Sequence, residues 1–559
     1  MQKLPPQFTP RLTLVLGLAA AFAVHFYFVW HHTGLWGVDG GAYLLSQHYV
    51  TTGEQIVDFK RPWLAPGFLL IPFTWAFGDD WGIRTFALVS WLPMMVPVWL
   101  FARIALTRWQ AVVSVLGVAF GLMLAEMFVA GSLPMVAFTG TFFCMWAVWR
   151  LCGSERPEWK HRISLALGIA WMAYTNQTSV GIALYLLPFW AIISIWLQPG
   201  TVRRKVRNMA VPVFAGAVLA LPTIPFFIQT APGSGMLRYP GPMFTTYNAD
   251  NAVWYYMAMF GPFAGYIAWR ATGFIRGLAV LMLLSLPIGA VYSFDESILN
   301  ITYRTRYLYT IYFYILAAWF GWHILGKHKR WLAACVLGAF AVLIPLNIYQ
   351  LHFETKLKRM VTADVQDGIE WLQAKDFPGG IGTNSYSMGL WVSAWTKKPV
   401  TWLQVWDPPP FYAEQHNNMA CLVAWDLDCD VPKAINELDV DYLLIERVWP
   451  ASNAEIAGIE GVGGIYDLVD RFSVMRWKQF GATWNAPKEA DAELSSDPYP
   501  WQITSEYALW LIPVWQQGTA KIWEVNRAYA SSGDTLASMP GRRIGPALER
   551  GDHSPREMD

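Results

Sequence analysis

The chain has 559 residues, of which 55% are hydrophobic and 16% aromatic, whereas only 14% are charged. A soluble domain usually carries about 25% charged residues, so this composition predicts a membrane protein. The formal net charge of +1 argues against a nucleic-acid partner, because proteins that bind a phosphate backbone normally carry a strong basic excess.

The first apolar run extends from Leu12 to Trp30 and follows Lys3 and Arg11. Its roughly 19 residues are long enough to cross a hydrocarbon core about 30 Å thick. A cleaved signal peptide would have a shorter apolar core and a small-residue cleavage site, and residues 31–33 offer none. We therefore expect a retained transmembrane helix.

The first external loop, residues 31–82, carries the residues on which the functional interpretation depends: Asp39, Asp58, Lys60 and Arg61. One short loop thus brings together a carboxylate that can act as a base and cations that can pair with phosphate. Asp58 could bind a divalent metal or orient Lys60 and Arg61, or it could form a plain surface ion pair with them.

Two apolar or amphipathic runs lie within this loop. The run from Ala42 to Val50 could lie along the bilayer surface, and its His48 could donate to a phosphate or bind a metal, although a lone histidine is more often structural. The run from Pro62 to Gly78 is short and interrupted by prolines, so we expect a re-entrant or interfacial helix backed by protein.

Ten further apolar runs follow, so we expect about eleven membrane crossings in total. They are Thr85–Ala102, Ala111–Ala130, Leu133–Trp149, Ile163–Tyr174, Val180–Leu197, Met209–Ile228, Ala252–Trp269, Leu278–Phe294, Tyr307–Leu325 and Trp331–Tyr349. Lys and Arg gather in alternate loops, which the positive-inside bias assigns to the cytoplasm. The N-terminus is then cytoplasmic, and the Asp39 loop and the C-terminal region lie outside.

The composition changes after residue 350. We expect an extracytoplasmic mixed α/β domain over residues 351–527 and a disordered tail over residues 528–559. Its predicted elements are a helix at Val361–Ala374 and strands at Gly380–Tyr386, Val400–Trp406, Asp441–Ile445, Phe472–Trp477 and Leu509–Val514. Cys421 and Cys429 would form a disulfide in this oxidising location, the alternative being two free thiols.

Short motifs in the first loop and before a late span carry a family resemblance. They are Asp39 followed by Tyr43, the turn Thr52-Gly53, Lys60-Arg61-Pro62, Phe77-Gly78, Arg84, and Tyr303-Arg304-Thr305-Arg306-Tyr307. In these motifs the chain resembles the GT-C superfamily of membrane glycosyltransferases, which use polyprenyl-phosphate sugars. The resemblance is closest to the branch related to protein O-mannosyltransferases and aminoarabinose transferases.

The resemblance implies an α-helical polytopic bundle of the GT-C type over residues 1–350. It implies transfer of a sugar from a polyprenyl-phosphate donor to a hydroxyl of a glycan, lipid or protein acceptor, on the outer face of the plasma membrane and in contact with its lipids. Relatives commonly carry Asp-Glu in the first loop, whereas Gly40 follows Asp39 here. The role of that glutamate is therefore absent or supplied elsewhere, and Asp58 is the nearest candidate.

Asp39 is the expected general base. It would take the proton of the acceptor hydroxyl as that oxygen attacks the anomeric carbon. No second carboxylate stands out as a nucleophile, so a single displacement with inversion is expected. The alternative role for Asp39 is a cap for the helix that begins near Gly41.

Four cations are candidates for the donor phosphate: Lys60, Arg61, Arg304 and Arg306. Arginine is favoured for paired contacts to phosphate oxygens, although arginines at the start of a span could instead anchor to lipid headgroups. Tyr43 and Tyr307 are further substrate-binding candidates. The chemistry requires no cofactor, and a divalent metal held by Asp58 or His48 is the one addition that the residues allow.

Two other classes of function remain open. A multi-span lipid or sugar transporter or flippase would also have many spans, but repeated span architecture and abundant charge within spans are not evident. A sugar-binding or scaffold domain on a membrane base would suit the tryptophan-rich region from Trp391 to Trp406, but it leaves the Asp39 loop unexplained.

Overall fold

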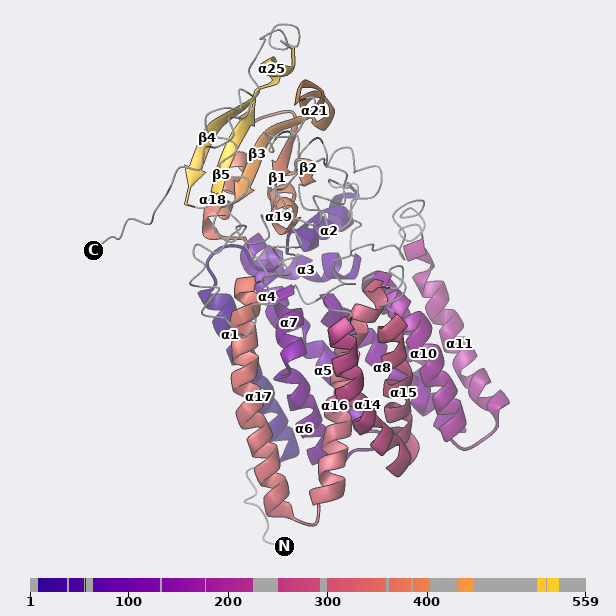
Figure 1. Ribbon diagram of the computed structural model, residues 1–559. Coiled ribbons are helices and arrows are strands. Elements are labelled where there is room, and N and C mark those ends of the chain that lie inside the picture. Colours follow the sequence, from indigo (N-terminus) through magenta and orange to yellow (C-terminus); the bar gives the residue numbers. More distant parts are fainter. Residues whose placement is uncertain are drawn as a thin grey trace, which may run out of the picture. The chain divides into compact units, whose positions relative to one another are not determined.

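The architecture is seen in a computed structural model of the chain (Figure 1). The structure describes residues 9–37, 40–54, 56, 64–130, 133–175, 177–224, 250–291, 299–357, 361–383, 386–402, 418, 422, 431–446, 510–518 and 520–531. The chain divides into two compact units, Met1–Ala363 and Asp364–Asp559.

The first unit is helical, as predicted. Its helices are α1 (Pro10–His31), α2 (Gly40–Thr52), α3 (Leu64–Phe77), α4 (Asp79–Ser90), α5 (Leu92–Ala102), α6 (Arg108–Ala119), α7 (Leu122–Ala130), α8 (Leu133–Gly153), α9 (Trp159–Thr175), α10 (Gln177–Leu197), α11 (Val202–Ala220), η1 (Leu221–Thr223), α14 (Asp250–Arg270), α15 (Gly273–Val291), α16 (Leu299–Leu325) and α17 (Lys329–Leu357).

Several of these helices are long and apolar enough to cross a membrane. Among the described residues there are six such segments: Pro10–His31, Asp79–Ala102, Met135–Gly153, Val202–Thr223, Leu308–Leu325 and Lys329–His352. Shorter apolar helices occur at Leu64–Phe77, Leu186–Leu197 and Gly273–Ser285. The segments support a membrane protein, and the number of crossings over the whole chain stays a prediction.

Helix α3 is continuous through Pro72 and packs against both α2 and α4. Its Gly67 lies so close to α2 that an added Cβ would be 2.7 Å from the backbone oxygen of Ser46. The side chain of Gln47 donates a hydrogen bond to Thr74 Oγ1 at 2.7 Å across the same contact. These contacts hold α2 on α3.

The second unit contains a sheet and short helices. Its elements are α18 (Ala363–Gln373), β1 (Gly380–Thr383), α19 (Tyr386–Thr396), β2 (Val400–Trp402), α21 (Val431–Leu438), β3 (Val440–Glu446), β4 (Leu511–Gln517), β5 (Ala520–Val525) and α25 (Arg527–Ser531). The strand order is β2-β1-β3-β5-β4, in which β1 is parallel to β2 and β3, while β5 is antiparallel to β3 and β4.

Apolar side chains of α18 and the strands form the core of this unit. Ile369, Ile381, Leu443 and Ile522 are all fully buried. Helix α18 approaches the sheet at Gly368, where an added Cβ would lie 3.0 Å from the Trp515 ring. The unit therefore has a mixed sheet covered by at least one amphipathic helix.

Two predictions for this unit need correction, and one strand had no prediction. The strand predicted at Gly380–Tyr386 is too long, because α19 begins at Tyr386 and its buried Met388, Trp391 and Val392 recur at helical spacing. Strand β5 was not predicted. The tail predicted from residue 528 begins with helix α25, which Arg527 ties down through ion pairs to Asp439 (2.8 Å) and Asp441 (2.6 Å).

Candidate functional site

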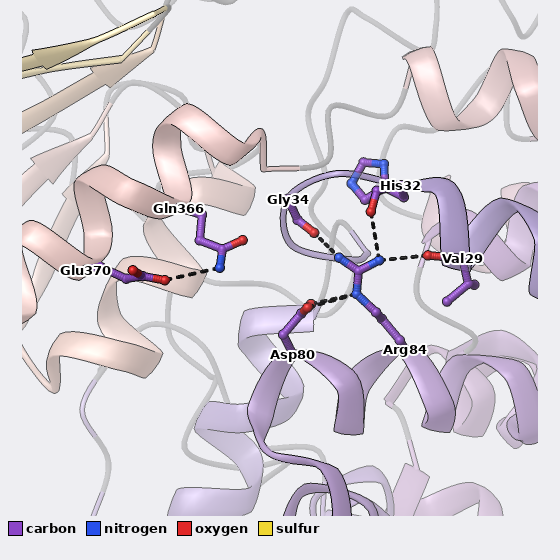
Figure 2. Close-up of polar contacts among 7 residues, drawn as sticks. All are labelled: Val29, His32, Gly34, Asp80, Arg84, Gln366 and Glu370. Atoms are coloured by element: carbon purple, nitrogen blue, oxygen red, sulfur yellow. Dashed lines mark hydrogen bonds and ion pairs between the residues drawn. The ribbon is translucent and has the colours of Figure 1, made fainter.

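A buried arginine anchors the start of the first loop. Arg84 Nε donates to both carboxylate oxygens of Asp80 at 2.9 Å, and Nη1 donates to the carbonyls of Val29 (2.7 Å) and His32 (3.0 Å). Nη2 donates to the carbonyl of Gly34. Figure 2 shows the guanidinium surrounded by these four partners, an arrangement that we call the Arg84 clamp.

The clamp provides hydrogen-bond donors for carbonyl groups that have no partner at the end of α1. The last carbonyls of an α-helix have no partner within the helix, and Val29 and His32 lie at the end of α1. A cation is also favoured there because the carbonyl end of a helix carries partial negative charge. Arg84 therefore closes α1 and fixes the direction in which the chain leaves it.

The ion pair within the clamp is well shielded. The Arg84 side chain is 5% exposed and that of Asp80 is 21% exposed. Trp81 lies beside the guanidinium, with 5.1 Å between Arg84 Cζ and its ring centroid. A buried charge is tolerated only when it is paired, so the two residues depend on each other.

The loop segment is also held from its other side. Leu35 N donates to Val361 O at 2.9 Å, which forms an isolated antiparallel bridge just after α17. Gly34 has φ +96°, and an added Cβ would lie 2.2 Å from that same carbonyl oxygen. Leu35 and Trp36 are fully buried. Residues 34–36 are thus fixed between the Arg84 clamp and Val361.

Substituting Gly34 with alanine should lower the free energy of unfolding by roughly 2–4 kcal/mol. Alanine disfavours the left-handed backbone conformation of this residue, and its Cβ would clash with the carbonyl oxygen of Val361. Gly53→Ala is the matched control, because Gly53 has φ +79° but an added Cβ would meet nothing within 4 Å. Apparent melting temperatures of the two variants in one detergent measure the difference. Equal shifts would show that the contact with Val361 contributes nothing.

His32 lies against the clamp and is neutral near pH 7. Burial, and to a smaller extent the charge of Arg84, lower the pKa of His32 to about 4. Its ring meets Trp36 edge to face, with centroids 5.5 Å apart. His32 is therefore part of the apolar wall of this segment and cannot serve as a phosphate-binding cation at neutral pH.

Helix α2 begins at Gly40, so Asp39 directly precedes it in the sequence. Tyr43 is 1% exposed and packs against Phe86, with ring centroids 5.7 Å apart. His48 lies farther along α2, and its Nε2 is 3.6 Å from a carboxylate oxygen of Glu54. Of these two candidates, Tyr43 belongs to the buried first part of α2 and His48 to its partly exposed second part.

The start of α16 lies at the same end of the bundle as the Arg84 clamp. Helices α16 and α17 form an antiparallel pair joined at residues 326–328, so α16 begins where α17 ends. Val361, just beyond α17, pairs with Leu35. Arg304, Arg306 and Tyr307 lie in the first turns of α16, and the structure describes their backbone.

Several predicted site residues lie outside the described residues: Asp39, Asp58, Lys60, Arg61, Cys421 and Cys429. Their roles, and those of Tyr43, His48, Arg304, Arg306 and Tyr307, stay predictions. Within the described ranges there is no group of three or more His, Cys, Asp and Glu residues that could hold a metal ion. Since Asp58 is outside those ranges, a metal there also stays a prediction.

The sequence by itself did not indicate the Arg84 clamp. Arg84 entered only as a residue of the family resemblance, and Gly34 and His32 had no role. The spacing of Asp80 and Arg84, four residues apart at the start of a helix, is a local signal for an ion pair. The carbonyl partners lie 50 to 55 residues away, and no local pattern indicates them.

No protein-family profile and no curated protein matches the sequence. Solved structures do match. The oligosaccharyltransferase of Archaeoglobus fulgidus, tethered to an acceptor peptide, is 11% identical, and the alignment covers 79% of this chain and 69% of that one with a TM-score of 0.51. The mycobacterial arabinofuranosyltransferase AftD is 13% identical, with 93% of this chain and 40% of AftD covered and a TM-score of 0.53.

The chain has a GT-C fold. It spans less than half of AftD, so the likeness to that protein concerns one part of it. The ArnT structure from Cupriavidus metallidurans, bound to undecaprenyl phosphate, aligns at 12% identity with a TM-score of 0.48, covering 77% of this chain and 92% of ArnT. The alignments with the oligosaccharyltransferase and with AftD, whose TM-scores exceed 0.5, confirm the predicted GT-C type of bundle as a fold.

Proposed function

We propose that this protein is a membrane glycosyltransferase that moves a sugar from a polyprenyl-phosphate donor to an acceptor hydroxyl. The observation that carries the proposal is the fold shared with two structures that are named as transferases of glycans, over 79% and 93% of this chain. The acceptor is a glycan, lipid or protein, and transfer takes place on the outer face of the plasma membrane.

The proposed chemistry is a single displacement. The acceptor oxygen attacks the anomeric carbon, its proton passes to Asp39, and the bond from that carbon to the phosphate oxygen breaks. The lipid phosphate leaves with the bonding electron pair, and attack from the opposite side inverts the anomeric carbon. Arg304 and Arg306, with Lys60 and Arg61, would stabilise the growing negative charge on the phosphate.

Two features of the described structure support this placement of the site. Residues 34–36, shortly before Asp39, are fixed by the Arg84 clamp and Val361. The first turns of α16, which carry Arg304 and Arg306, are at the same end of the bundle. A fixed scaffold near the reacting groups is what catalysis by positioning requires.

The direct test is an assay of the purified protein in lipid with a panel of polyprenyl-phosphate sugars. Release of polyprenyl phosphate together with a glycosylated acceptor is the expected result. If no donor in the panel is cleaved but intact donor crosses the membrane of proteoliposomes, the function is transport and the proposal of an enzyme is wrong.

The orientation belongs to the proposal as well. Lys and Arg gather in alternate loops, so we expect Asp39 and Cys421 outside and Arg204 and Lys329 in the cytoplasm. In intact cells, a thiol reagent that does not cross the membrane should label single cysteines at positions 39 and 421. It should not label single cysteines at positions 204 and 329. Labelling of position 421 only after permeabilisation would reverse the orientation.

The external location also favours a bridge between Cys421 and Cys429. Such a short ring would contribute about 2–3 kcal/mol to the free energy of unfolding. The chain has five cysteines, so thiol counting under denaturing, non-reducing conditions should find three reactive thiols. Five reactive thiols would refute the bridge.

A further inference from the structure

Three arginine–tryptophan pairs gather at the end of the first unit away from the Arg84 clamp. Arg162 lies over Trp159 at the start of α9 (5.7 Å from Cζ to the ring centroid), Arg270 over Trp269 at the end of α14 (4.2 Å), and Arg276 over Trp196 at the end of α10 (5.6 Å). Helices that follow each other in the chain run in opposite directions, so the start of α9 and the end of α10 lie at one end of the bundle, as do the end of α14 and the start of α15. We call these six residues the stacked-arginine surface.

Contacts between the helices bring these ends close together. Helix α15 packs on α10 near this end, where an added Cβ on Gly277 would lie 2.9 Å from Leu197 Cδ1. Helix α14 packs on α15, and α10 packs on α9. The three pairs therefore belong to neighbouring helices of one surface.

The three tryptophans are exposed on this surface. Trp159 is 73%, Trp269 71% and Trp196 62% exposed, although each is a large aromatic residue. Exposed tryptophan at the end of an apolar helix is favoured where hydrocarbon meets headgroups, because the indole has an apolar body and one polar N–H. This placement points to a lipid boundary.

The charge of this surface is not balanced by carboxylates. In the segments that form it, the acidic residues are Glu155 and Glu158, which already pair with Arg204 (3.2 Å) and Lys160 (2.6 Å). Among the described residues, Arg162, Arg270 and Arg276 form no ion pair with a carboxylate. Exposed arginines also occur near the adjoining ends of α8, α9 and α11: Arg150, Arg156, Arg203 and Arg207.

A guanidinium that lies over the face of an indole keeps N–H groups free to bind two oxygens of one phosphate. Stacking also restricts the side chain before a ligand arrives, which lowers the entropic cost of binding. We propose that the stacked-arginine surface binds the phosphates of anionic phospholipid headgroups, phosphatidylglycerol being the simplest example. The tryptophans lie at the headgroup boundary and the arginines contact the phosphates.

The test is a titration of the purified full-length protein in detergent with phosphatidylglycerol or phosphatidylcholine, followed by native mass spectrometry. Wild type should bind phosphatidylglycerol more tightly. Each arginine near an anionic lipid contributes roughly a fivefold change in affinity. The variant R162Q/R270Q/R276Q should therefore bind phosphatidylglycerol on the order of 100-fold more weakly.

The matched control is K327Q/K329Q/R330Q, which removes the same charge from the α16–α17 loop at the same end of the bundle. Its affinity should fall clearly less than that of R162Q/R270Q/R276Q, because the proposal requires a guanidinium beside an indole and not charge alone. A third variant, R162K/R270K/R276K, keeps the charge but loses the planar guanidinium with its paired N–H donors, so we expect about tenfold weaker binding.

Three outcomes would overturn the proposal: equal affinity for the two lipids, an equal loss in the loop control, or wild-type affinity of the lysine variant. Apparent melting temperatures check that each variant is folded, and if the glutamine variant is not, the lysine variant decides. The readout is lipid binding, so the result does not depend on the proposed glycosyl transfer.

Discussion

Replacing Asp39 with asparagine is expected to lower the rate of sugar transfer by roughly 100-fold or more while donor affinity changes little. Asparagine keeps the size and much of the hydrogen bonding of aspartate but cannot accept the acceptor's proton. Asp39 directly precedes α2, and asparagine caps a helix about as well as aspartate. A loss of the helix cap is therefore not expected to contribute.

The measurement is transfer rate and donor affinity in one detergent and lipid background. Asp58→Asn is measured beside it, because it removes the other candidate carboxylate of the same loop and should lower transfer less than Asp39→Asn. Arg306→Ala provides the contrast, since it should weaken donor binding as well as transfer, and lysine at that position should restore only part of both. Near-normal turnover of folded Asp39→Asn would make Asp58 the next candidate for the base.

Replacing Arg84 with methionine is expected to lower the free energy of unfolding by roughly 3–5 kcal/mol. The substitution leaves the Asp80 carboxylate shielded and unpaired, and it removes the donors to the carbonyls of Val29, His32 and Gly34. Transfer should fall as well under the proposed function, because the segment leading to Asp39 loses one of its two anchors.

Two further variants separate the charge from the hydrogen bonds. The double variant Asp80→Asn with Arg84→Met removes both charges, so it should be more stable than Arg84→Met alone. It should remain less stable than wild type, because the three carbonyls still lack their donor. Asp80→Asn alone should cost less than Arg84→Met, because the three carbonyl bonds persist. Apparent melting temperatures measure all three proteins. A folded Arg84→Met protein within about 1 kcal/mol of wild type would show that the clamp is not a major source of stability.

The sequence alone predicted the class of the protein and many of its elements. Runs of about twenty apolar residues indicate membrane helices because the hydrocarbon thickness sets their length, and helices such as α1 and α17 lie where such runs predict them. The parallel strands β1 and β3 were also indicated by short apolar runs. These signals are local, so they can be read without knowing what packs against them.

Strand β5 and the end of β1 could not be predicted from local sequence patterns. Strand β5 pairs with both β3 and β4, and its place in the sheet depends on those partners rather than on its own pattern. The start of α19 at Tyr386 was missed because a short apolar run fits a strand or a buried helix equally well.

The membrane bundle was predicted from the lengths of the apolar runs, and its GT-C type was implied by a family resemblance in short motifs, one of which contains Asp39. Only the tertiary structure decided that Arg84 closes α1 and that Gly34 lies against Val361, some 330 residues later in the chain. The physical reason is that apolar periodicity is a property of one segment, whereas a buried arginine needs acceptors and a glycine contact needs a second backbone. Those partners exist only when distant helix ends have been brought to the same place.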